Sequence, residues 1–559
     1  MKIKNSVPKK WELLYSGKVF DENEIIEILL KNRGCQTEKQ KNEFLKPKHP
    51  LDVSLLDVGM DKDAVRESIT RIVKAIKNKE HILIYGDYDA DGVCATAIMW
   101  ESLYKYTKNV MPYIPNRFSE GYGINADSIV SIKSQNPKVS LIITVDNGIV
   151  ACDAVKRAKD LGIDVIVTDH HQKGENLPDA YSIVHTDKIS GAGISWIFCR
   201  ELLKKLSKED VPNVAISALD LCAIGTISDQ MPLLSTNRSF AKYGIKQINL
   251  TKRIGLKALV ETAGLQMGKI GVYEINFHIA PRINATGRLD SAIDSLRLLC
   301  VKNQKRACQL AESLNKTNIE RQKILDEVLS LARKEVEKQV WQGVIVVAHE
   351  TFHEGVIGLA ASKIVEQYYL PAIVISKGES VSKASARSIS GFNIIESIRQ
   401  HSQLILNGGG HPMAAGFSIE TAKIEQFTQQ ILKSSSTTIT DEVKTRKLKI
   451  DLSLGLDQIT TSLYEKLQLF EPVGVANPNP VFMTGSLTVK DLKVVGNDGK
   501  HIKLVLSDAS NLINAIGFNM VDFNIKIGDV VDVAYTIELN AWNGQETLEL
   551  KLKDLKKHG

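Results

Sequence analysis

The sequence predicts an α/β protein in which two α/β modules are joined by a long helix and followed by a small β-barrel. Three observations predict this class. From about residue 66, apolar runs of four to six residues alternate with helical segments. A charged helical stretch without glycine or proline covers 291–340, and the chain beyond 440 is rich in short strands. The alternation is typical of βαβ units with a buried parallel sheet.

Composition limits the class of protein further. The 559 residues are 43% hydrophobic and 24% charged, which is ordinary for a globular chain and excludes a disordered or collagenous one. Seven cysteines without a C-x-x-C pair argue against a disulfide framework or a thiolate zinc site. No apolar run is long enough for a membrane span and no secretory signal is evident, so we expect a cytosolic protein. The net charge of +6 permits nucleic-acid binding without demonstrating it.

The modules follow one another along the chain. Residues 1–65 contain one clear amphipathic helix, IIEILLKN, that stops at Gly34, and we assign this segment no chemistry. The first α/β module covers 66–290, with the strands HILIYG, LIITV and DVIVT, and the helical connection covers 291–340. The second α/β module covers 341–435, where KSSSTTIT is interpreted as a linker. The strands of 440–559 predict a barrel of the OB type.

Acidic residues and histidines follow apolar runs of the first module. DYDADG begins at Asp87, VDNG and TDHH contain Asp146 and His170, and Asp229 ends DLCAIGTISD, which we also interpret as a strand. Each aspartate alone would be a helix cap more often than a ligand. Several carboxylates at the edge of one parallel sheet repel one another unless cations neutralise them, because their charges are close together. The pattern therefore predicts a metal site beyond the carboxyl ends of the strands.

The kind of metal site can be narrowed by its ligands. DYDADG matches the opening of a calcium-binding EF-hand loop, but the twelfth position is Ile98 where that loop needs a glutamate. Carboxylates combined with imidazole suit Mn²⁺ or Mg²⁺ better than a closed thiolate zinc cage. A pair of such ions would serve phosphoryl chemistry, since they can stabilise both the attacking and the leaving oxygen.

These four motifs resemble those of the DHH phosphoesterase family. Further segments, RFSEGYGIN, APRINATGRLD, LNKTNIERQ, HEGVIG, ASARS and GGGHPMAAGF, resemble the RecJ branch of that family, the single-strand-specific 5′-to-3′ DNA exonucleases. The likeness covers most of 80–420. It implies a DHH catalytic domain, a connecting helix, a smaller DHHA1 domain and a C-terminal OB-fold. One departure is His185-Thr186, where the family has an asparagine-proline stretch, so the loop before SGAG is expected to differ in shape.

The resemblance also implies roles for single residues. The metal ligands that it implies are four aspartates and one histidine: Asp87, Asp89, Asp146, His170 and Asp229. The catalytic residues that it implies are Asp91, Asp169 and His171. In this assignment Asp146 bridges two ions, Asp169 orients its histidine neighbours, and His171 contacts the scissile phosphate.

A second set of residues is expected to hold the substrate. By the same resemblance, the 5′-terminal phosphate would be held by three arginines and a serine: Arg117, Arg282, Ser385 and Arg387. The glycine-rich segment could cradle a phosphate with its backbone N–H groups, through Gly408, Gly409, Gly410 and His411. Arg288 and His411 are weaker candidates, since either could be a structural hydrogen-bonding residue, and Asn284 is expected to support a turn. Aromatic residues that could stack on bases are set aside, since an aromatic residue in a strand more often belongs to a core: Phe118, Tyr122, Phe518, Tyr535 and Trp542.

The expected function is a metal-dependent exonuclease that degrades single-stranded DNA in repair and recombination. Expected partners are single-stranded DNA, a helicase and a single-strand-binding protein, and the chain is expected to be a monomer. Two alternatives stay open. A DHH-family phosphodiesterase for short oligonucleotides or cyclic dinucleotides would generally lack the RINATGR segment and the barrel. A non-catalytic DNA-binding scaffold would have lost its ligands, whereas this sequence retains the acids and His170.

Overall fold

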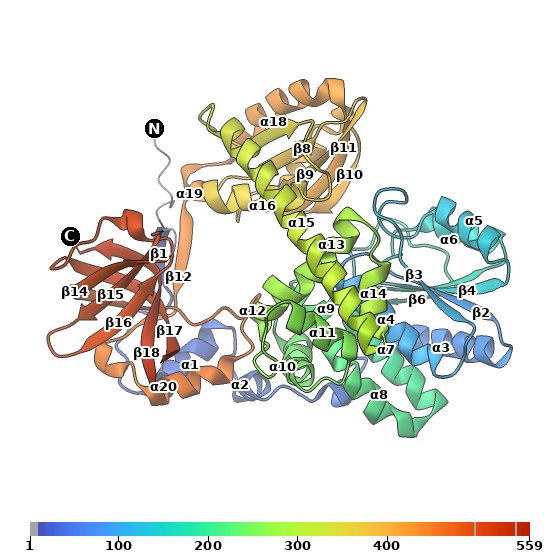
Figure 1. The fold of residues 1–559 in the computed structure, drawn as a ribbon, viewed down its shortest axis with the longest axis horizontal. Coiled ribbons are helices and arrows are strands. Elements are labelled where there is room, and N and C mark those ends of the chain that lie inside the picture. The colour runs from blue at the N-terminus through green and yellow to red at the C-terminus, as the bar shows by residue number, and fades with distance from the viewer. Residues whose placement is uncertain (1–8, 497–498, 543–544, 559) are drawn as a thin grey trace. The chain divides into compact units, whose positions relative to one another are not determined.

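The computed structural model describes residues 9–496, 499–542 and 545–558 (Figure 1). They form two compact units. The parallel-sheet unit consists of 35–320 and 470–478, and the barrel unit consists of the described residues of 1–34, 321–469 and 479–559. Each unit is described by itself below. The longest helix, α15 (Gln304–Val336), begins in the parallel-sheet unit and ends in the barrel unit.

A five-stranded sheet forms the centre of the parallel-sheet unit. All its pairings are parallel, in the order β3-β2-β4-β5-β6. Its strands are β2 (His81–Tyr85), β3 (Val110–Tyr113), β4 (Val139–Val145), β5 (Asp164–Asp169) and β6 (Ser182–His185). The central strands carry few polar residues because both faces of the sheet are covered. Parallel pairing brings the carboxyl ends of all five strands to one edge.

Helices cover both faces of this sheet (Figure 1). Ile82 and Ile84 of β2 point into a large core with α3 (Lys62–Lys77), α4 (Ala90–Tyr104) and α7 (Gly191–Leu206), whereas Leu83 and Tyr85 point into a smaller core with α5 (Ala126–Gln135) and α6 (Cys152–Asp160). This alternation is expected for a strand that is buried on both faces. The helices of the unit are α2 (Glu38–Leu45), α3 (Lys62–Lys77), α4 (Ala90–Tyr104), α5 (Ala126–Gln135), α6 (Cys152–Asp160), α7 (Gly191–Leu206), α8 (Val211–Ser217), α9 (Leu219–Ser228), α10 (Ser235–Asn249), α11 (Ile254–Thr262), α12 (Val272–Glu274), α13 (Ala280–Leu289) and α14 (Ile293–Cys300).

A short segment distant in sequence completes the unit. Residues 470–478 belong to it although the chain on either side of them belongs to the barrel unit. The fully buried guanidinium of Arg238 holds this segment, because it donates hydrogen bonds to the carbonyl oxygens of three of its residues and to that of Phe44, at 2.7 to 3.1 Å. A buried charge without such acceptors would be strongly unfavourable. The segment is therefore a structural part of the parallel-sheet unit.

The barrel unit contains a second α/β sheet in the order β10-β11-β9-β8-β7. Only β7 and β8 are parallel, and the remaining pairs are antiparallel. The strands are β7 (Ile345–His349), β8 (Ala372–Ser376), β9 (Val381–Arg387), β10 (Ile405–His411) and β11 (Ala414–Glu420). The helices are the end of α15, α16 (Ile357–Tyr368), α17 (Ile394–Arg399), α18 (Ile424–Thr438) and α19 (Asp441–Lys444).

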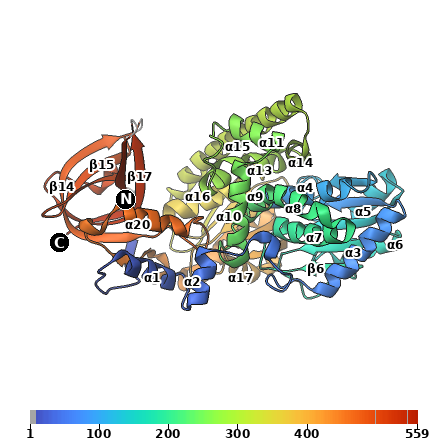
Figure 2. The same cartoon turned by 90° about the horizontal axis from the view of Figure 1, so that it is seen from below.

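The barrel is closed by pairing between its first and fourth long strands, β14 and β17. Its strands are β13 (Leu452–Ser453), β14 (Phe482–Val495), β15 (His501–Ser507), β16 (Leu512–Gly517), β17 (Val530–Trp542) and β18 (Gln545–Lys557). The parallel pair β16–β18 and the order of the long strands are those of an OB-fold, as the sequence predicted. Helix α20 (Thr461–Leu467) lies beside the barrel and next to α1 (Glu22–Asn32) (Figure 2).

Three local features refine the sequence interpretation. The helix that the sequence placed before Gly34 is α1, and Gly34 has the positive φ of +82° that favours glycine after a helix. The N-terminal strand β1 (Lys9–Leu13) pairs in parallel with β12 (Arg446–Ile450). The linker predicted for KSSSTTIT is wrong, because α18 continues to Thr438. Its hydroxyls donate to carbonyls of the preceding turn, as Thr438 does to Ser434, and so remain compatible with a helix.

None of the described helices is by itself both long and apolar enough to span a bilayer. The helical segments 208–217 and 219–228, which are bent relative to each other, reach that length and apolarity only when they are taken together.

Candidate metal centre

The loop that follows β2 carries the first group of acids. Asp89 caps α4, since its Oδ1 accepts a hydrogen bond from Gly92 N at 3.0 Å. Asn284 of α13 accepts a hydrogen bond from Ala90 N at 2.7 Å and so supports the same turn. A Cβ at Gly92 would lie 2.6 Å from the Cβ of Asp87, so only glycine fits there. The loop geometry therefore directs Asp87 and Asp89 to the edge of the sheet.

Asp146 follows β4 in a strained backbone conformation. Its φ is +65°, in the left-handed region that few residues other than glycine adopt. Its Oδ1 lies 3.0 Å from His170 Nε2. A Cβ at Gly191, the first residue of α7, would lie 2.4 Å from the same oxygen, so the absence of a side chain there makes room for the carboxylate. Strain of this kind persists at functional sites because the surroundings enforce it.

The two adjacent histidines after β5 have different surroundings. His170 Nε2 faces the carboxylates, at 3.7 Å from Asp229 Oδ2 and 3.9 Å from Asp91 Oδ2. His171 Nδ1 lies 2.7 Å from Asp169 Oδ1, which also accepts hydrogen bonds from the backbone N–H groups of both histidines. Asp169 therefore positions the His171 ring and the backbone of the pair. Burial opposes the charge on the imidazole, but the hydrogen bond with Asp169 and the negative charges of neighbouring aspartates together exceed this effect and raise the pKa of His171 to about 9.

Asp91 and Asp229 complete the cluster from two helices. The Asp91 carboxylate accepts hydrogen bonds from Gly191 N at 2.7 Å and Ala192 N at 3.0 Å, at the N-terminus of α7. Asp229 follows α9, so the strand predicted for DLCAIGTIS is wrong. Nearly every residue of α9 is buried, and an apolar run without periodicity does not distinguish a buried helix from a buried strand. Asp229 nevertheless lies beside His170, as stated above.

The electrostatics of these groups fit divalent cations. Burial, and after it the charge of neighbouring aspartates, raises the pKa of Asp87 and Asp146 well above the ordinary value, that of Asp91 to about 7 and that of Asp229 to about 9. The buried Asp87 Oδ1 accepts no hydrogen bond from the described residues. Such an arrangement is unfavourable unless positive charge offsets it.

Three groups of residues could each hold a metal ion, because the ligand atoms within each group lie within 4.8 Å of one another. The groups are Asp87 with Asp89 and Asp146, Asp91 with His170 and Asp229, and Asp146 with His170 and His171. Asp146 and His170 each belong to two of these groups. Carboxylate oxygens with one or two imidazole nitrogens are a donor set for Mn²⁺ or Mg²⁺. The residues present therefore fit such ions.

Polar and aromatic neighbours adjoin the cluster. The half-exposed Tyr122 places its hydroxyl 2.9 Å from His171 Nε2, a role that sequence reasoning missed because 49 residues separate the two. The motif RFSEGYGIN, which contains Tyr122, was the feature of the sequence that could have indicated this role. The Arg117 guanidinium lies 5.4 Å from the ring centroid of Tyr88, within the DYDADG loop. Arg282 of α13 donates to Asn315 Oδ1 and to the carbonyl of His278.

The segment His185-Thr186, for which the sequence predicted an unusual loop, lies beside this edge. His185 Nε2 lies 2.7 Å from the carbonyl oxygen of His171, and Thr186 donates a hydrogen bond to the carbonyl of Val58. The segment thus supports the backbone of the histidine pair.

The other predicted substrate residues lie in the barrel unit. Arg387 Nη1 donates to Ser385 Oγ at 3.2 Å on β9. Gly358, from HEGVIG, is the third member of this group, since a Cβ there would lie 3.0 Å from Ser385 Oγ and 3.2 Å from Arg387 Nη2. The motif HEGVIG was part of the resemblance to the family, but the sequence alone did not indicate a role for Gly358. The group presents a hydroxyl and a guanidinium on one sheet.

The glycine-rich segment adopts a strand instead of a loop. Gly408, Gly409, Gly410 and His411 belong to β10 and pair with β11. A Cβ at Gly410 would lie 2.4 Å from the carbonyl oxygen of Ala414, so the close pairing of the hairpin requires glycine there. Because β10 is an edge strand, backbone groups on its outer side lie outside the sheet pairing. The side chain of Trp542 lies outside the described residues, and Tyr535 is fully buried in the barrel.

Comparison with known proteins places these features in a family. Three family models match the chain: the DHH family N-terminal domain over residues 81–226, the DHHA1 domain over 322–435 and the RecJ OB domain over 450–554. A curated relative from Bacillus subtilis strain 168, named single-stranded-DNA-specific exonuclease RecJ, is 35% identical over 95% of this chain and 67% of its own length. The protein of the same name from Escherichia coli K12 is 30% identical over 88% of this chain and 90% of its own length.

Solved structures agree with this assignment. The crystal structure of RecJ in complex with Mn²⁺ from Thermus thermophilus has a TM-score of 0.83 at 28% identity, covering 98% of this chain and 80% of that one. The structure of the same protein with Mg²⁺ has a TM-score of 0.77 at 26% identity, covering 98% and 79%. The parallel sheet, its acidic edge and the second α/β domain define a DHH-type phosphoesterase. With the matched OB domain and these relatives, the chain belongs to the RecJ family.

Proposed function

We propose that this chain is a metal-dependent exonuclease that hydrolyses single-stranded DNA from its 5′ end, in DNA repair and recombination. The observation that carries the proposal is the presence of three groups of aspartates and histidines that share Asp146 and His170, the ligand atoms within each group lying within 4.8 Å of one another. The relatives named single-stranded-DNA-specific exonuclease support the substrate. A phosphodiesterase for cyclic dinucleotides is disfavoured, because the RecJ OB domain model also matches this chain.

We assign two Mn²⁺ or Mg²⁺ ions to Asp87, Asp89, Asp146, His170 and Asp229. Bound there, such ions would polarise the phosphodiester and favour attack by water. The protein contributes rigidity: the left-handed backbone of Asp146 and the cap at Asp89 fix two of the ligands before substrate arrives. Asp91 is the third acid of the DYDADG loop. The N-terminus of α7 holds its carboxylate beside His170.

His171 acts on the phosphate in this proposal. Asp169 accepts the hydrogen bond from Nδ1, which leaves Nε2 directed at the Tyr122 hydroxyl. In that position the ring can donate to a non-bridging phosphate oxygen when substrate replaces the hydroxyl. Tyr122 would then be free to contact the terminal sugar or base. Asp169 is thus a positioning residue for His171.

Recognition of the 5′ end is assigned to Arg117, Arg282, Ser385 and Arg387. A terminal phosphomonoester carries more charge and more free oxygens than an internal diester, so guanidinium groups discriminate between the two. The close pair of Ser385 and Arg387 supports this role, since a hydroxyl and a guanidinium 3.2 Å apart suit a single phosphate. The edge strand with Gly408, Gly409, Gly410 and His411 would contribute backbone donors, and Arg288 remains a weaker candidate.

The barrel would add affinity for the strand without reading its sequence. We further propose that the chain acts as a cytosolic monomer, and that a helicase and a single-strand-binding protein supply its substrate. The domain boundaries that we propose are 66–290 for the catalytic domain, 291–340 for the connecting helix, 341–435 for the DHHA1 domain and 440–559 for the OB domain, after an N-terminal segment of 1–65.

The test uses end-labelled oligonucleotides with Mn²⁺ and the full chain. Single-stranded DNA should shorten from its 5′ end, whereas duplex DNA of the same sequence should persist. Asp89→Ala should be inactive, and the matched Asp127→Asn, which removes an exposed carboxylate from α5, should keep full activity. Shortening from the 3′ end, or equal loss of duplex, would contradict the proposal.

A further inference from the structure

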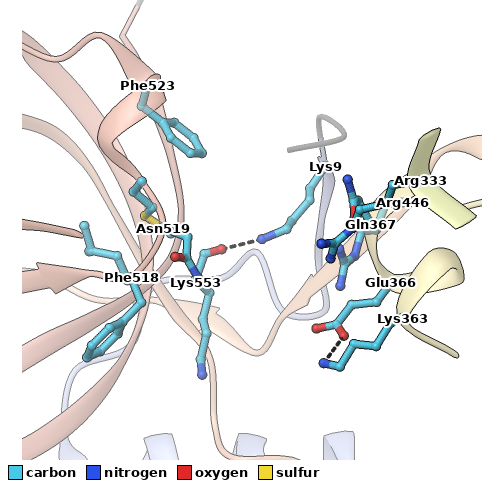
Figure 3. Close-up of a pocket in the computed structure, with 12 residues that line it drawn as sticks. Lys9, Arg333, Lys363, Glu366, Gln367, Arg446, Phe518, Asn519, Phe523 and Lys553 are labelled. Carbon is cyan, nitrogen blue, oxygen red and sulfur yellow. Dashed lines mark hydrogen bonds and ion pairs between the residues drawn. The ribbon is translucent and has the colours of Figure 1, made fainter. Parts of the chain in front are cut away.

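A basic pocket of about 450 Å³ lies within the barrel unit, apart from the metal centre described above. Its walls come from β1, α15, α16, β12 and the barrel. Figure 3 shows Arg333, Arg446 and Gln367 on one side, the barrel residues Phe518 and Phe523 on the other, and Lys9 extending between them. A volume of this size can hold a compact ligand of the nucleotide class.

Positive charge dominates the lining. Five of the twelve lining residues are cationic: Lys9, Arg333, Lys363, Arg446 and Lys553. The acidic residue among them, Glu366, already forms an ion pair with Lys363 at 2.8 Å. Arg333 donates instead to the neutral amide oxygen of Gln367 at 2.9 Å. The pocket therefore carries an excess of positive charge that its own carboxylate does not balance.

The lysines of the pocket also affect one another. Burial first, and then the charges of Arg446 and Lys553, lower the pKa of Lys9, while Asp554 acts in the opposite direction. Burial, followed by the charge of Lys551, lowers the pKa of Lys553. Lys9 Nζ donates to the backbone carbonyl of Lys553, so its ammonium is held at the pocket wall. An anion in the pocket would relieve this repulsion.

The barrel wall is apolar and aromatic. Phe518 is 45% exposed, and Phe523 is half-buried. Met520 and Leu552, which also line the pocket, are buried. The ring of Phe518 is further fixed by His501, at a centroid distance of 5.2 Å. Guanidinium and ammonium groups that line the same pocket as aromatic side chains form a combination suited to a phosphate joined to a base, because bases stack on aromatic faces while the cations hold phosphate oxygens.

We propose that this pocket binds the phosphate groups of a nucleotide, with the phosphates against Lys9, Arg333 and Arg446 and the base against the phenylalanines. The nucleotide could be one unit of a bound single strand or a free nucleotide, since both offer the same chemistry. The interpretation as a unit of a bound strand rests on the proposed exonuclease function, whereas the interpretation as a free nucleotide does not. Binding is therefore measured separately from hydrolysis.

The experiment compares the full chain with two double variants in the presence of Mn²⁺. Arg446→Gln with Lys553→Gln removes two pocket charges. Lys10→Gln with Lys449→Gln removes two exposed charges, at positions of β1 and β12 that alternate with Lys9 and Arg446 and so face the opposite side of the strands. Thermal melting curves confirm that each variant is folded. Both variants change the net charge equally, so general electrostatic attraction cannot distinguish them.

Two probes separate the sources. One is a fluorescent phosphorothioate oligothymidylate of about 20 nucleotides, long enough to reach beyond one OB-fold site and resistant to cleavage. The other is radiolabelled deoxythymidine triphosphate. We expect the pocket variant to lose about tenfold or more in affinity for at least one probe, the factor that follows from losing a charge-assisted contact, while the control variant stays within about twofold. Loss for the oligonucleotide alone assigns the pocket to the strand, and loss for the triphosphate assigns it to a free nucleotide.

Two further measurements test the chemistry. Phe518→Ala should weaken binding of the triphosphate but not of inorganic pyrophosphate, since only the former has a base to stack. Equal affinities of both pocket and control variants for both probes would overturn the proposal. Displacement of the bound probe by a hexaglutamate peptide as effectively as by the nucleotide would also overturn it, because the pocket would then be a site for acidic peptides. Failure of hydrolysis with intact binding would contradict only the exonuclease proposal.

Discussion

Substitution of Gly191 by alanine should inactivate the enzyme although it adds a single methyl group. The added Cβ would lie 2.4 Å from Asp146 Oδ1, whereas ordinary contact begins at 3.4 Å, so the carboxylate or α7 must move by about 1 Å. A displacement of that size at a reacting centre can cost about a hundredfold in rate. We therefore expect kcat to fall by roughly that factor.

Stability should change far less than activity in this variant. Alanine favours the helix over glycine by about 1 kcal/mol, while overpacking of a buried position costs about 1–3 kcal/mol. The two effects largely offset each other, so the melting temperature should fall by only a few degrees. Gly174→Ala is the matched control, because a Cβ there would meet its nearest neighbours at ordinary contact distances of 3.5 and 3.6 Å.

The assay is single-turnover hydrolysis of a 5′-labelled oligonucleotide at saturating Mn²⁺, together with Mn²⁺ titration of the protein. Gly191→Ala should show both a slower rate and weaker Mn²⁺ binding. If it retained more than about half of the activity of the unmodified chain, given that a 1 Å displacement commonly costs far more, the reasoning that Gly191 makes room for Asp146 would be refuted.

Three further outcomes are expected. Asp89→Ala and His170→Ala should each leave less than about a tenth of the activity at saturating Mn²⁺ while remaining folded, since loss of even an outer partner of a metal ligand typically costs ten- to a hundredfold; a more active variant would exclude that residue as a ligand. Arg387→Ala should cost about 1–3 kcal/mol in apparent affinity for 5′-phosphorylated strands and much less for 5′-hydroxyl strands in a competition assay, with equal losses contradicting a terminal-phosphate site. Without metal, the folded pKa values of about 7 for Asp91 and about 9 for Asp229 exceed the reference value of 3.8 for the unfolded chain. The folded state then binds more protons than the unfolded one, so its stability is lost as pH rises from about 4 towards about 9, and the difference in melting temperature between Mn²⁺-loaded and EDTA-treated protein should widen over that range. A difference independent of pH would argue against a bound ion that stabilises the charged forms of these two acids.

Much of the architecture was predictable because its signals are local. Buried parallel strands such as β2 and β4 are continuous apolar runs bounded by polar turns, and helices such as α3 and α6 have clear amphipathic spacing. The barrel strands alternate inward and outward residues in the expected way. The acids after β2, β4 and β5 were placed at one edge because parallel pairing requires it.

The rest depended on contacts between distant residues. Helix α9 is buried on all sides, so its sequence lacks the periodicity that separates a helix from a strand, and Asp229 was placed after the wrong kind of element. The hydrogen bond between Tyr122 and His171 and the proximity of Gly358 to Arg387 join segments that no sequence spacing connects. The basic pocket was unpredictable for the same reason, since its cations come from β1, α15, α16, β12 and β18.

The buried contact of Arg238 with the segment 470–478 has a consequence for synthesis of the protein. The ribosome releases Arg238 more than 200 residues before its acceptor carbonyls emerge, as the separation of 232 residues between Arg238 and Phe470 shows. Until then the guanidinium lacks most of its partners, so the parallel-sheet unit cannot reach its final packing during the early part of translation. Completion of the unit that carries the metal ligands is thereby delayed until most of the chain has been made.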